Sequence, residues 1–249
     1  MGWKSWEPHA QRLSATRRVV RVQLISVQYG LEQRPLPEGY SVRMESSALA
    51  NAIERLDLEF PVDIAAWSFG AATSLDYALD HPERVRTLTL IEPPALWVLG
   101  GETPEDGAFK KMVEMMDSIK GDINEGQLVT FLHSAGIVPD GVAPETLPQW
   151  PGWMQHRRSL LNTFAPFDHK DDPARLRRFD RPVLLVKGTG SAPWLHQVID
   201  ALAERLPNAR VIELPRGHGP QLTSIDRFLE EMTRFQDEVR IKEMIYSHV

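Results

Sequence analysis

Short apolar runs alternate along this chain with segments in which apolar residues recur every three or four positions. Continuous apolar runs favour buried strands, and a period of three to four residues favours helices with one buried face. The pattern predicts strands at 18–25, 62–66, 85–91, 181–187 and 209–214. It predicts helices at 9–13, 45–56, 69–79, 194–206 and 224–235. Strands that alternate with helices in this way indicate a mostly parallel sheet with helices on both faces, which is an α/β fold.

The alternation is interrupted between residues 96 and 172. Glycine, proline, methionine and tryptophan are frequent there, and helical spacing appears only at 109–119 and 127–135. A structureless loop of this length is uncommon in a compact domain. We therefore expect residues 96–172 to form an inserted helical cap, and residues 1–95 and 173–249 to form the α/β core.

Composition limits the classes of function. The 249 residues are 42% hydrophobic and 25% charged, and a net charge of −6 with a pI near 5.8 argues against nucleic-acid or anionic-membrane partners. The chain has no cysteine, which excludes disulfides, thiolate metal sites and a cysteine nucleophile. No apolar run approaches the ~18 residues of a membrane span. We expect a cytoplasmic protein without metal or cofactor; the oligomeric state stays open, a homodimer included.

The most distinctive pattern is the pentad Ala66-Trp67-Ser68-Phe69-Gly70, which joins a predicted strand to a predicted helix. It is a variant of the G-x-S-x-G nucleophile elbow, with alanine in the first position. That sharp turn exposes the serine hydroxyl and calls for small residues two places before and after the serine. It also brings the Phe69 N–H beside Ser68, where it can stabilise a developing oxyanion. The alternative is an ordinary strand-to-helix turn with an incidental serine.

The pentad is part of a wider set of motifs, which resembles the capped α/β-hydrolases of the serine esterase and lactonase branch. The set spans nearly all of the chain and includes Asp80-His-Pro-Glu-Arg-Val85, Arg181-Pro-Val-Leu-Leu-Val186 and Leu214-Pro-Arg-Gly-His-Gly-Pro220. In this family the nucleophile, the acid and the histidine follow in that order. The resemblance therefore implies Ser68 as nucleophile and His218 as base. His218 also follows the last predicted strand, on the edge of the sheet that carries the elbow.

The acid departs from the common pattern of that family. Most such enzymes carry an aspartate after the strand that corresponds to 181–187, and this chain has Ser191 there. Glu92 ends the strand that follows the elbow helix, and from that edge its carboxylate can face the histidine loop. We expect Glu92 to be the acid that fixes the histidine tautomer; capping a helix or pairing with an arginine is its alternative role. Three further candidates lie in a polar segment typical of solvated carboxylates: Asp168, Asp171 and Asp172.

The beginning of the chain also departs from the family. Related enzymes open with additional strands, one of which ends in His-Gly and leads to the second oxyanion donor. The resemblance places that strand between the predicted strands at 18–25 and 62–66. We expect the sequence to be short at its N-terminus, with Gly2 or Met1 as the remaining source of a second N–H donor. The alternative is that the two flanking strands pair directly.

The substrate is indicated only by aromatic and methionine side chains. If they converge, they line an apolar pocket for a small molecule; the alternative is that most of them belong to the core of the cap. The candidate substrate-binding residues are Trp67, Trp97, Trp150 and Trp153. We expect hydrolysis of a carboxylic ester or lactone with an apolar portion, through an acyl-enzyme. Two other classes stay open: an impaired hydrolase fold that binds a small ligand, and a C–C bond hydrolase or perhydrolase with the same triad.

Overall fold

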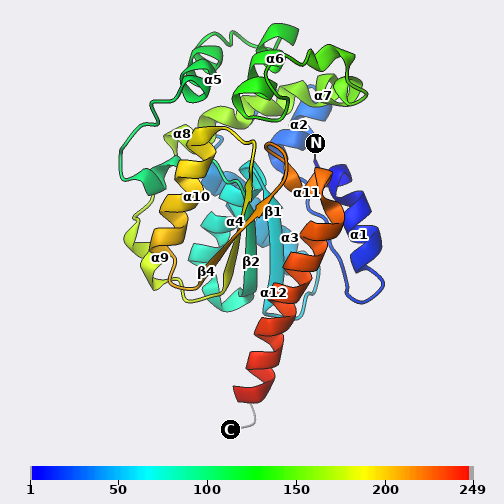
Figure 1. Ribbon diagram of the computed structural model, residues 1–249, viewed down its shortest axis with the longest axis vertical. Coiled ribbons are helices and arrows are strands. Elements are labelled where there is room, and N and C mark those ends of the chain that lie inside the picture. Colours follow the sequence, from blue (N-terminus) through cyan, green and yellow to red (C-terminus); the bar gives the residue numbers. More distant parts are fainter. Residues whose placement is uncertain (1, 247–249) are drawn as a thin grey trace.

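A computed structural model describes residues 2–246 of the chain (Figure 1). Its centre is a parallel four-stranded sheet in the order β1-β2-β3-β4. The predicted α/β class and the parallel sheet are thereby confirmed. The strands are β1 Val62–Trp67, β2 Val85–Ile91, β3 Val183–Gly188 and β4 Ala209–Leu214.

Helices surround this sheet. The α-helices are α1 Glu7–Leu13, α2 Ile25–Leu31, α3 Val42–Arg55, α4 Phe69–Asp80, α5 Gly107–Asp117, α6 Glu125–Ser134, α7 Trp150–His156, α8 Phe164–Asp168, α9 Ala174–Arg178, α10 Pro193–Arg205, α11 Pro220–Thr223 and α12 Ile225–Tyr246. Short 3-10 helices are η1 Trp3–Trp6, η2 Pro82–Arg84, η3 Leu96–Leu99, η4 Pro144–Thr146 and η5 Arg157–Thr163. Within residues 2–246, none of the helices combines the length and the apolar character that crossing a bilayer would take.

Alternate side chains of the two central strands face two separate cores. Leu88 and Leu90 of β2 pack with Leu185 of β3 in a cluster that also holds residues of α3, α4, α9 and α10. Leu184 and Val186 of β3 point the other way and pack in a cluster with α12. Successive side chains of a strand alternate between its faces, and strands buried on both faces carry apolar residues at every position. Helices therefore cover both faces of the sheet, as the pattern predicted.

The predicted strand at 18–25 is wrong. Residues 18–24 carry no strand pairing, and α2 begins at Ile25. Within the described part of the chain β1 pairs only with β2, so this segment has no neighbouring strand to bond with. Strand propensity alone does not form a strand without such a partner. Direct pairing of residues 18–25 with β1, the alternative arrangement, is absent as well.

The long segment between β2 and β3 is mostly helical. Helices α5, α6 and α7 lie together above the sheet in the view of Figure 1, and α2 lies beside α7. Their apolar residues form two clusters separate from the two cores of the sheet. The first contains Met112, Met115 and Ala135, and the second contains Leu128 and Leu132. Whether residues 96–172 act as a unit that caps the core stays a prediction.

Candidate active site

Ser68 occupies the sharp turn between β1 and α4. Its φ of 55° and ψ of −127° lie in a region that residues with a side chain rarely adopt. Three backbone hydrogen bonds hold the turn: the Ser68 N–H donates to the carbonyl of Ile91 at 2.8 Å, and the Ser68 carbonyl accepts from the N–H groups of Ala71 at 2.8 Å and Ala72 at 3.1 Å. A strained serine between a strand and a helix is the geometry of a nucleophile elbow.

Three side chains from three different loops form one line of hydrogen bonds. His218 Nε2 lies 2.9 Å from Ser68 Oγ, and His218 Nδ1 lies 2.8 Å from Glu92 Oε2. An ionised carboxylate can only accept, so Nδ1 carries the ring proton and the lone pair of Nε2 faces the serine hydroxyl. That order of donors and acceptors is what a serine needs for activation. The structure thus brings together the three residues expected to form the triad.

Glu92 is fully buried at the end of β2, and its Oε1 accepts the N–H of Gly188 at 2.8 Å. Burial alone raises the pKa of Glu92, but hydrogen bonds from His218, Ser191 and the Gly188 N–H outweigh it and hold the pKa below its usual value. The Ser191 hydroxyl contributes although it lies outside strict hydrogen-bond geometry. The carboxyl group is therefore ionised and able to hold the imidazole.

The loop that carries His218 depends on a close backbone contact. The His218 N–H donates to the carbonyl of Gly136 at 2.9 Å, and a Cβ on Gly217 would lie 1.7 Å from that same oxygen. Gly219 has a φ of 116°, where a side chain would be strained. The two glycines beside His218 are therefore required.

The first oxyanion donor is available at the elbow. Phe69 is the first residue of α4, so its N–H has no acceptor within the helix. The backbone hydrogen bonds of residues 2–246 include none from this N–H. Gly2 lines the same cavity as Ser68, but its role as the second donor stays a prediction. Met1 lies outside the described residues.

Ser68 and His218 open on a cavity of about 130 Å³. This is close to the ~150 Å³ that admits a benzene molecule in an apolar protein interior. Its wall is mostly apolar and comes from α2, α5, α6, the segment after α6, α8 and α10, with residues that include Val27, Met112, Phe131, Ile137, Phe167 and Leu195. The site thus suits a small apolar group beside the serine.

The structure brings only one of the four expected tryptophans to this cavity. Trp67 lines it, and the Trp67 ring lies 5.4 Å from the imidazole of His218. Trp97 instead lines a separate hollow of about 610 Å³, and Trp150 and Trp153 pack against a cluster around Leu128. These three tryptophans therefore do not converge on the cavity beside Ser68, because spacing along the chain does not say which neighbour a side chain meets; a role for them in substrate binding stays a prediction. Phe131 was missed for the same reason, although the spacing of α6 marks it as an inward position.

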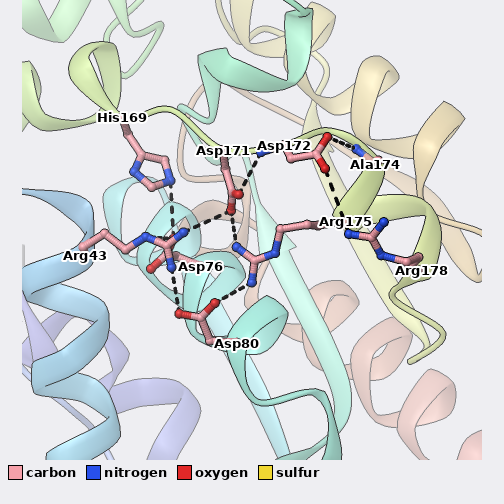
Figure 2. A network of polar contacts seen from close by, with 9 residues as sticks. All are labelled: Arg43, Asp76, Asp80, His169, Asp171, Asp172, Ala174, Arg175 and Arg178. Atoms are coloured by element: carbon pink, nitrogen blue, oxygen red, sulfur yellow. Dashed lines mark hydrogen bonds and ion pairs between the residues drawn. The ribbon is translucent and has the colours of Figure 1, made fainter.

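The alternative acids form no hydrogen bond or ion pair with His218 within residues 2–246. Figure 2 shows Asp171 in a network that joins α3, α4 and α9. Its carboxylate lies 2.6 Å from Arg175 and 3.4 Å from Arg43, and its side chain is only 7% exposed. The expectation of a solvated Asp171 is therefore wrong, because two guanidinium groups compensate its burial.

The same network contains a group of possible metal ligands. Ligand atoms of Asp76, His169 and Asp171 lie within 4.8 Å of one another. Arg43 already lies 3.3 Å from Asp76, however, and Arg175 pairs with Asp171. Two guanidinium cations beside these carboxylates disfavour a further cation.

Comparison with known proteins agrees with this geometry. The alpha/beta hydrolase family matches residues 1–231 of the chain. A pimeloyl-[acyl-carrier protein] methyl ester esterase of Neisseria meningitidis is 26% identical over 222 residues, which cover 87% of this chain and 82% of that protein. A 2-hydroxymuconate semialdehyde hydrolase of Pseudomonas putida is 24% identical over 236 residues, which cover 91% of this chain and 79% of that one.

The fold is shared with solved structures as well. The crystal structure of a hydrolase from Pseudomonas aeruginosa superposes with a TM-score of 0.72 and 19% sequence identity, over 94% of this chain and 85% of that one. The family match spans most of the chain, including the elbow at Ser68 and the loop of His218. The chain therefore belongs to the alpha/beta hydrolase family, and its activity is that of a hydrolase.

Proposed function

We propose that this protein hydrolyses a carboxylic ester or lactone through a Ser68–His218–Glu92 triad. The observation that carries the proposal is the unbroken line of hydrogen bonds, 2.9 Å and 2.8 Å long, between these side chains at the wall of an apolar cavity. A receptor with an impaired hydrolase fold does not need this alignment. The esterase among its relatives supports the same reaction class.

In the proposed reaction Ser68 Oγ attacks the carbonyl carbon and its proton moves to His218 Nε2. The Phe69 N–H stabilises the tetrahedral oxyanion, and Glu92 stabilises the imidazolium. The imidazolium then gives its proton to the leaving alkoxide, which departs as an alcohol and leaves an acyl-enzyme. His218 next takes a proton from water, and the hydroxide attacks the acyl carbon. The imidazolium then returns this proton to Ser68 Oγ as the bond between that oxygen and the acyl carbon breaks, so that the acid is released and both residues are restored.

The cavity favours a substrate with a small apolar portion. Its volume of about 130 Å³ and its largely apolar wall suit a short acyl chain or a compact ring. We propose that residues 96–172 act as a cap, because Met112, Phe131 and Ile137 of this segment complete the wall opposite the elbow. Of the four tryptophans expected to bind substrate, Trp67 lines this cavity beside His218, and we propose that it contacts the substrate.

A C–C bond hydrolase is the second candidate. One observation favours it: a 2-hydroxy-6-oxo-2,4-heptadienoate hydrolase of Pseudomonas putida is 36% identical over 89 residues, which cover 36% of this chain and 31% of that protein. Hydrolysis of a C–C bond next to a carbonyl can use the same triad. The two candidates differ in the leaving group, which is an alkoxide for the ester and a carbanion for the C–C bond.

The test combines an active-site probe with a substrate panel. A fluorophosphonate should label the wild-type protein and leave Ser68→Ala unlabelled, because only an activated serine reacts with it. Short aryl esters and lactones should be hydrolysed faster than vinylogous diketones in the same assay. Absence of labelling in the folded wild-type protein would contradict catalysis by Ser68, and faster cleavage of the diketones would favour the C–C bond hydrolase.

A further inference from the structure

Apart from two tryptophan indoles, the cavity beside Ser68 holds four polar side chains, and one of them neither takes part in the proposed catalysis nor hydrogen-bonds within its own segment. Ser68 and His218 belong to the triad, and Ser159 Oγ donates to the carbonyl of His156 at 2.6 Å. Asn162 is the fourth, and it is only 8% exposed. The other wall residues are apolar, glycine or the tryptophans Trp67 and Trp194. A nearly buried amide in an apolar wall is costly unless both of its ends find partners.

One end of the amide is held from behind. Asn162 Nδ2 donates to Ser26 Oγ at 3.0 Å, and Ser26 lies in the first turn of α2. Glu45 stabilises that same turn, because its carboxylate accepts the N–H of Ile25 at 2.8 Å and that of Ser26 at 2.9 Å. The hydroxyl of Tyr40 also donates to Glu45, at 2.6 Å. Asn162 is thus the last member of a buried polar chain.

The hydrogen bond to Ser26 sets the direction of the amide. Its donor is Asn162 Nδ2 and its acceptor is Ser26 Oγ. The amide nitrogen therefore lies toward Ser26, and Oδ1 is the opposite end. Further along the chain the Tyr40 hydroxyl donates to Glu45, and burial raises the pKa of Tyr40, so the phenol keeps its proton.

The backbone of residues 2–246 and the described side chains, which do not include that of Thr163, make no hydrogen bond to Asn162 Oδ1. We propose that this oxygen accepts a hydrogen bond from the substrate, so that the enzyme prefers an ester or lactone whose portion in the cavity carries a hydroxyl or an amide N–H. The inference rests on the proposed ester hydrolysis and specifies its substrate class. A site built to pair with such a group discriminates strongly against the analogue without it, because the buried acceptor is then left unpaired.

Matched pairs of 4-nitrophenyl esters test the inference. Each pair has a short acyl chain with either a hydroxyl or a methyl group at one position, and the position moves from C3 to C5 across the series. The measured quantity is the ratio of kcat/KM for the hydroxy ester to kcat/KM for its methyl counterpart. In Asn162→Leu this ratio should fall about tenfold for at least one pair, because the acceptor is removed at similar side-chain volume.

Two further variants separate recognition from a general disturbance. Ser26→Ala removes the group that orients the amide, so the ratio should fall in this variant too. Ser159→Ala alters the same wall at a hydroxyl that is bound to the carbonyl of His156, and the ratio should stay within about twofold of wild type. If Asn162→Leu does not fold, the ratio measured for Ser26→Ala tests the inference: a fall supports it, and an unchanged ratio overturns it.

The outcomes distinguish this inference from the proposed function. If the wild-type protein hydrolyses the esters and every ratio is unchanged in Asn162→Leu, the inference is wrong and ester hydrolysis stands. If neither turnover nor fluorophosphonate labelling occurs, the proposed function is wrong. Binding of the same pairs to Ser68→Ala, measured by calorimetry, then decides the inference by itself. Loss of the hydroxyl preference on adding Asn162→Leu supports it, and an unchanged preference overturns it.

Discussion

At the residue scale, Glu92 combines a local strain with a fixed charge. Its φ of 45° is unusual for a residue with a side chain, and two prolines follow it. The carboxylate holds the Gly188 N–H with one oxygen and His218 with the other. Such strain persists where the surrounding bonds fix the residue. The position of the histidine ring therefore depends on Glu92 rather than on a residue of the β3–α10 loop, where Ser191 stands.

Replacement of this carboxylate tests the assignment. Glu92→Gln should lower kcat for an aryl ester about 10³- to 10⁴-fold, because an amide neither enforces the productive tautomer nor stabilises the imidazolium. Steady-state hydrolysis of 4-nitrophenyl butyrate measures the effect. Asp168→Asn, which removes an exposed carboxylate, is the matched control and should keep its activity. Activity of Glu92→Gln within tenfold of wild type would show that another group orients His218.

Gly70 differs from what the elbow pattern led us to expect. A small residue was expected there, yet a Cβ added to Gly70 meets no atom within 4 Å, because the position faces the cavity. Gly70→Ala should therefore stabilise the protein by about 0.5 kcal/mol through helix propensity in α4. Ala66→Leu should destabilise it by about 1–3 kcal/mol through overpacking. Urea denaturation measures the change in the free energy of unfolding for both variants. A lower stability of Gly70→Ala would show that position 70 does require glycine.

At the scale of elements, the sequence correctly predicted the strands and helices whose regularly spaced apolar residues are buried against neighbouring elements. Strands β1 to β4 and helix α4 appear close to their expected positions. Residues 18–24 fail because a strand needs a partner, and nothing in local spacing reveals whether one is there. Helix α12 was expected to end at Phe235 and continues to Tyr246, because its last turns leave the core and expose Ile241 and Ile245. Beyond the buried Gln236, the helix continues with half-buried and exposed positions, held mainly by its backbone hydrogen bonds.

The candidate site shows the same limit. Ser68, Glu92 and His218 lie at strand ends, and the topology of a parallel sheet brings such ends to one edge. The three residues could therefore be predicted from the order of strands and helices along the sequence. The wall of the cavity could not, because it depends on how helices from the segment between β2 and β3 settle over that edge. No pattern in the sequence singles out Asn162. Its proposed role follows only from its place in the cavity wall and its hydrogen bond to Ser26.

Arg43 of α3 pairs with two carboxylates of α4 and with Asp171 of the segment before α9 (Figure 2). Its guanidinium lies near three carboxylates, of which Asp76 is almost fully buried and Asp171 nearly so. Arg43→Met should destabilise the protein by about 2–3 kcal/mol. This is less than the ~3–5 kcal/mol of a fully buried pair, because Arg43 is itself 44% exposed.

Equilibrium unfolding in urea measures this loss. Arg178→Met is the matched control: its pair with Asp172 spans 4.0 Å between exposed side chains, so it should shift stability by no more than about 0.5 kcal/mol. Equal effects of the two variants would show that the network adds nothing beyond surface charge.

At the scale of the whole molecule, the buried His9 and the half-buried His156 link stability to pH. Burial is the main cause that lowers the pKa of His9, against a hydrogen bond to the carbonyl of Gln221 that raises it. Burial and the charge of Lys4 lower the pKa of His156 to about 4. In each case the folded pKa lies below that of the unfolded chain, which is about 6.5. The unfolded state therefore binds more protons as the pH falls below about 6.5.

It follows that the free energy of unfolding should decrease as the pH falls from about 6.5 toward 4, before most carboxylates are protonated. His156→Gln removes one of the two groups and should flatten this slope. The flattening should be smaller than the ~1.4 kcal/mol per pH unit of one full proton, because the ring is partly exposed to solvent. Urea denaturation at pH 8, 6 and 5 gives the slope. The comparison at pH 8, where the histidine is neutral in both states, isolates the packing cost of the substitution. A slope in His156→Gln equal to that of wild type would mean that His156 does not couple folding to protons.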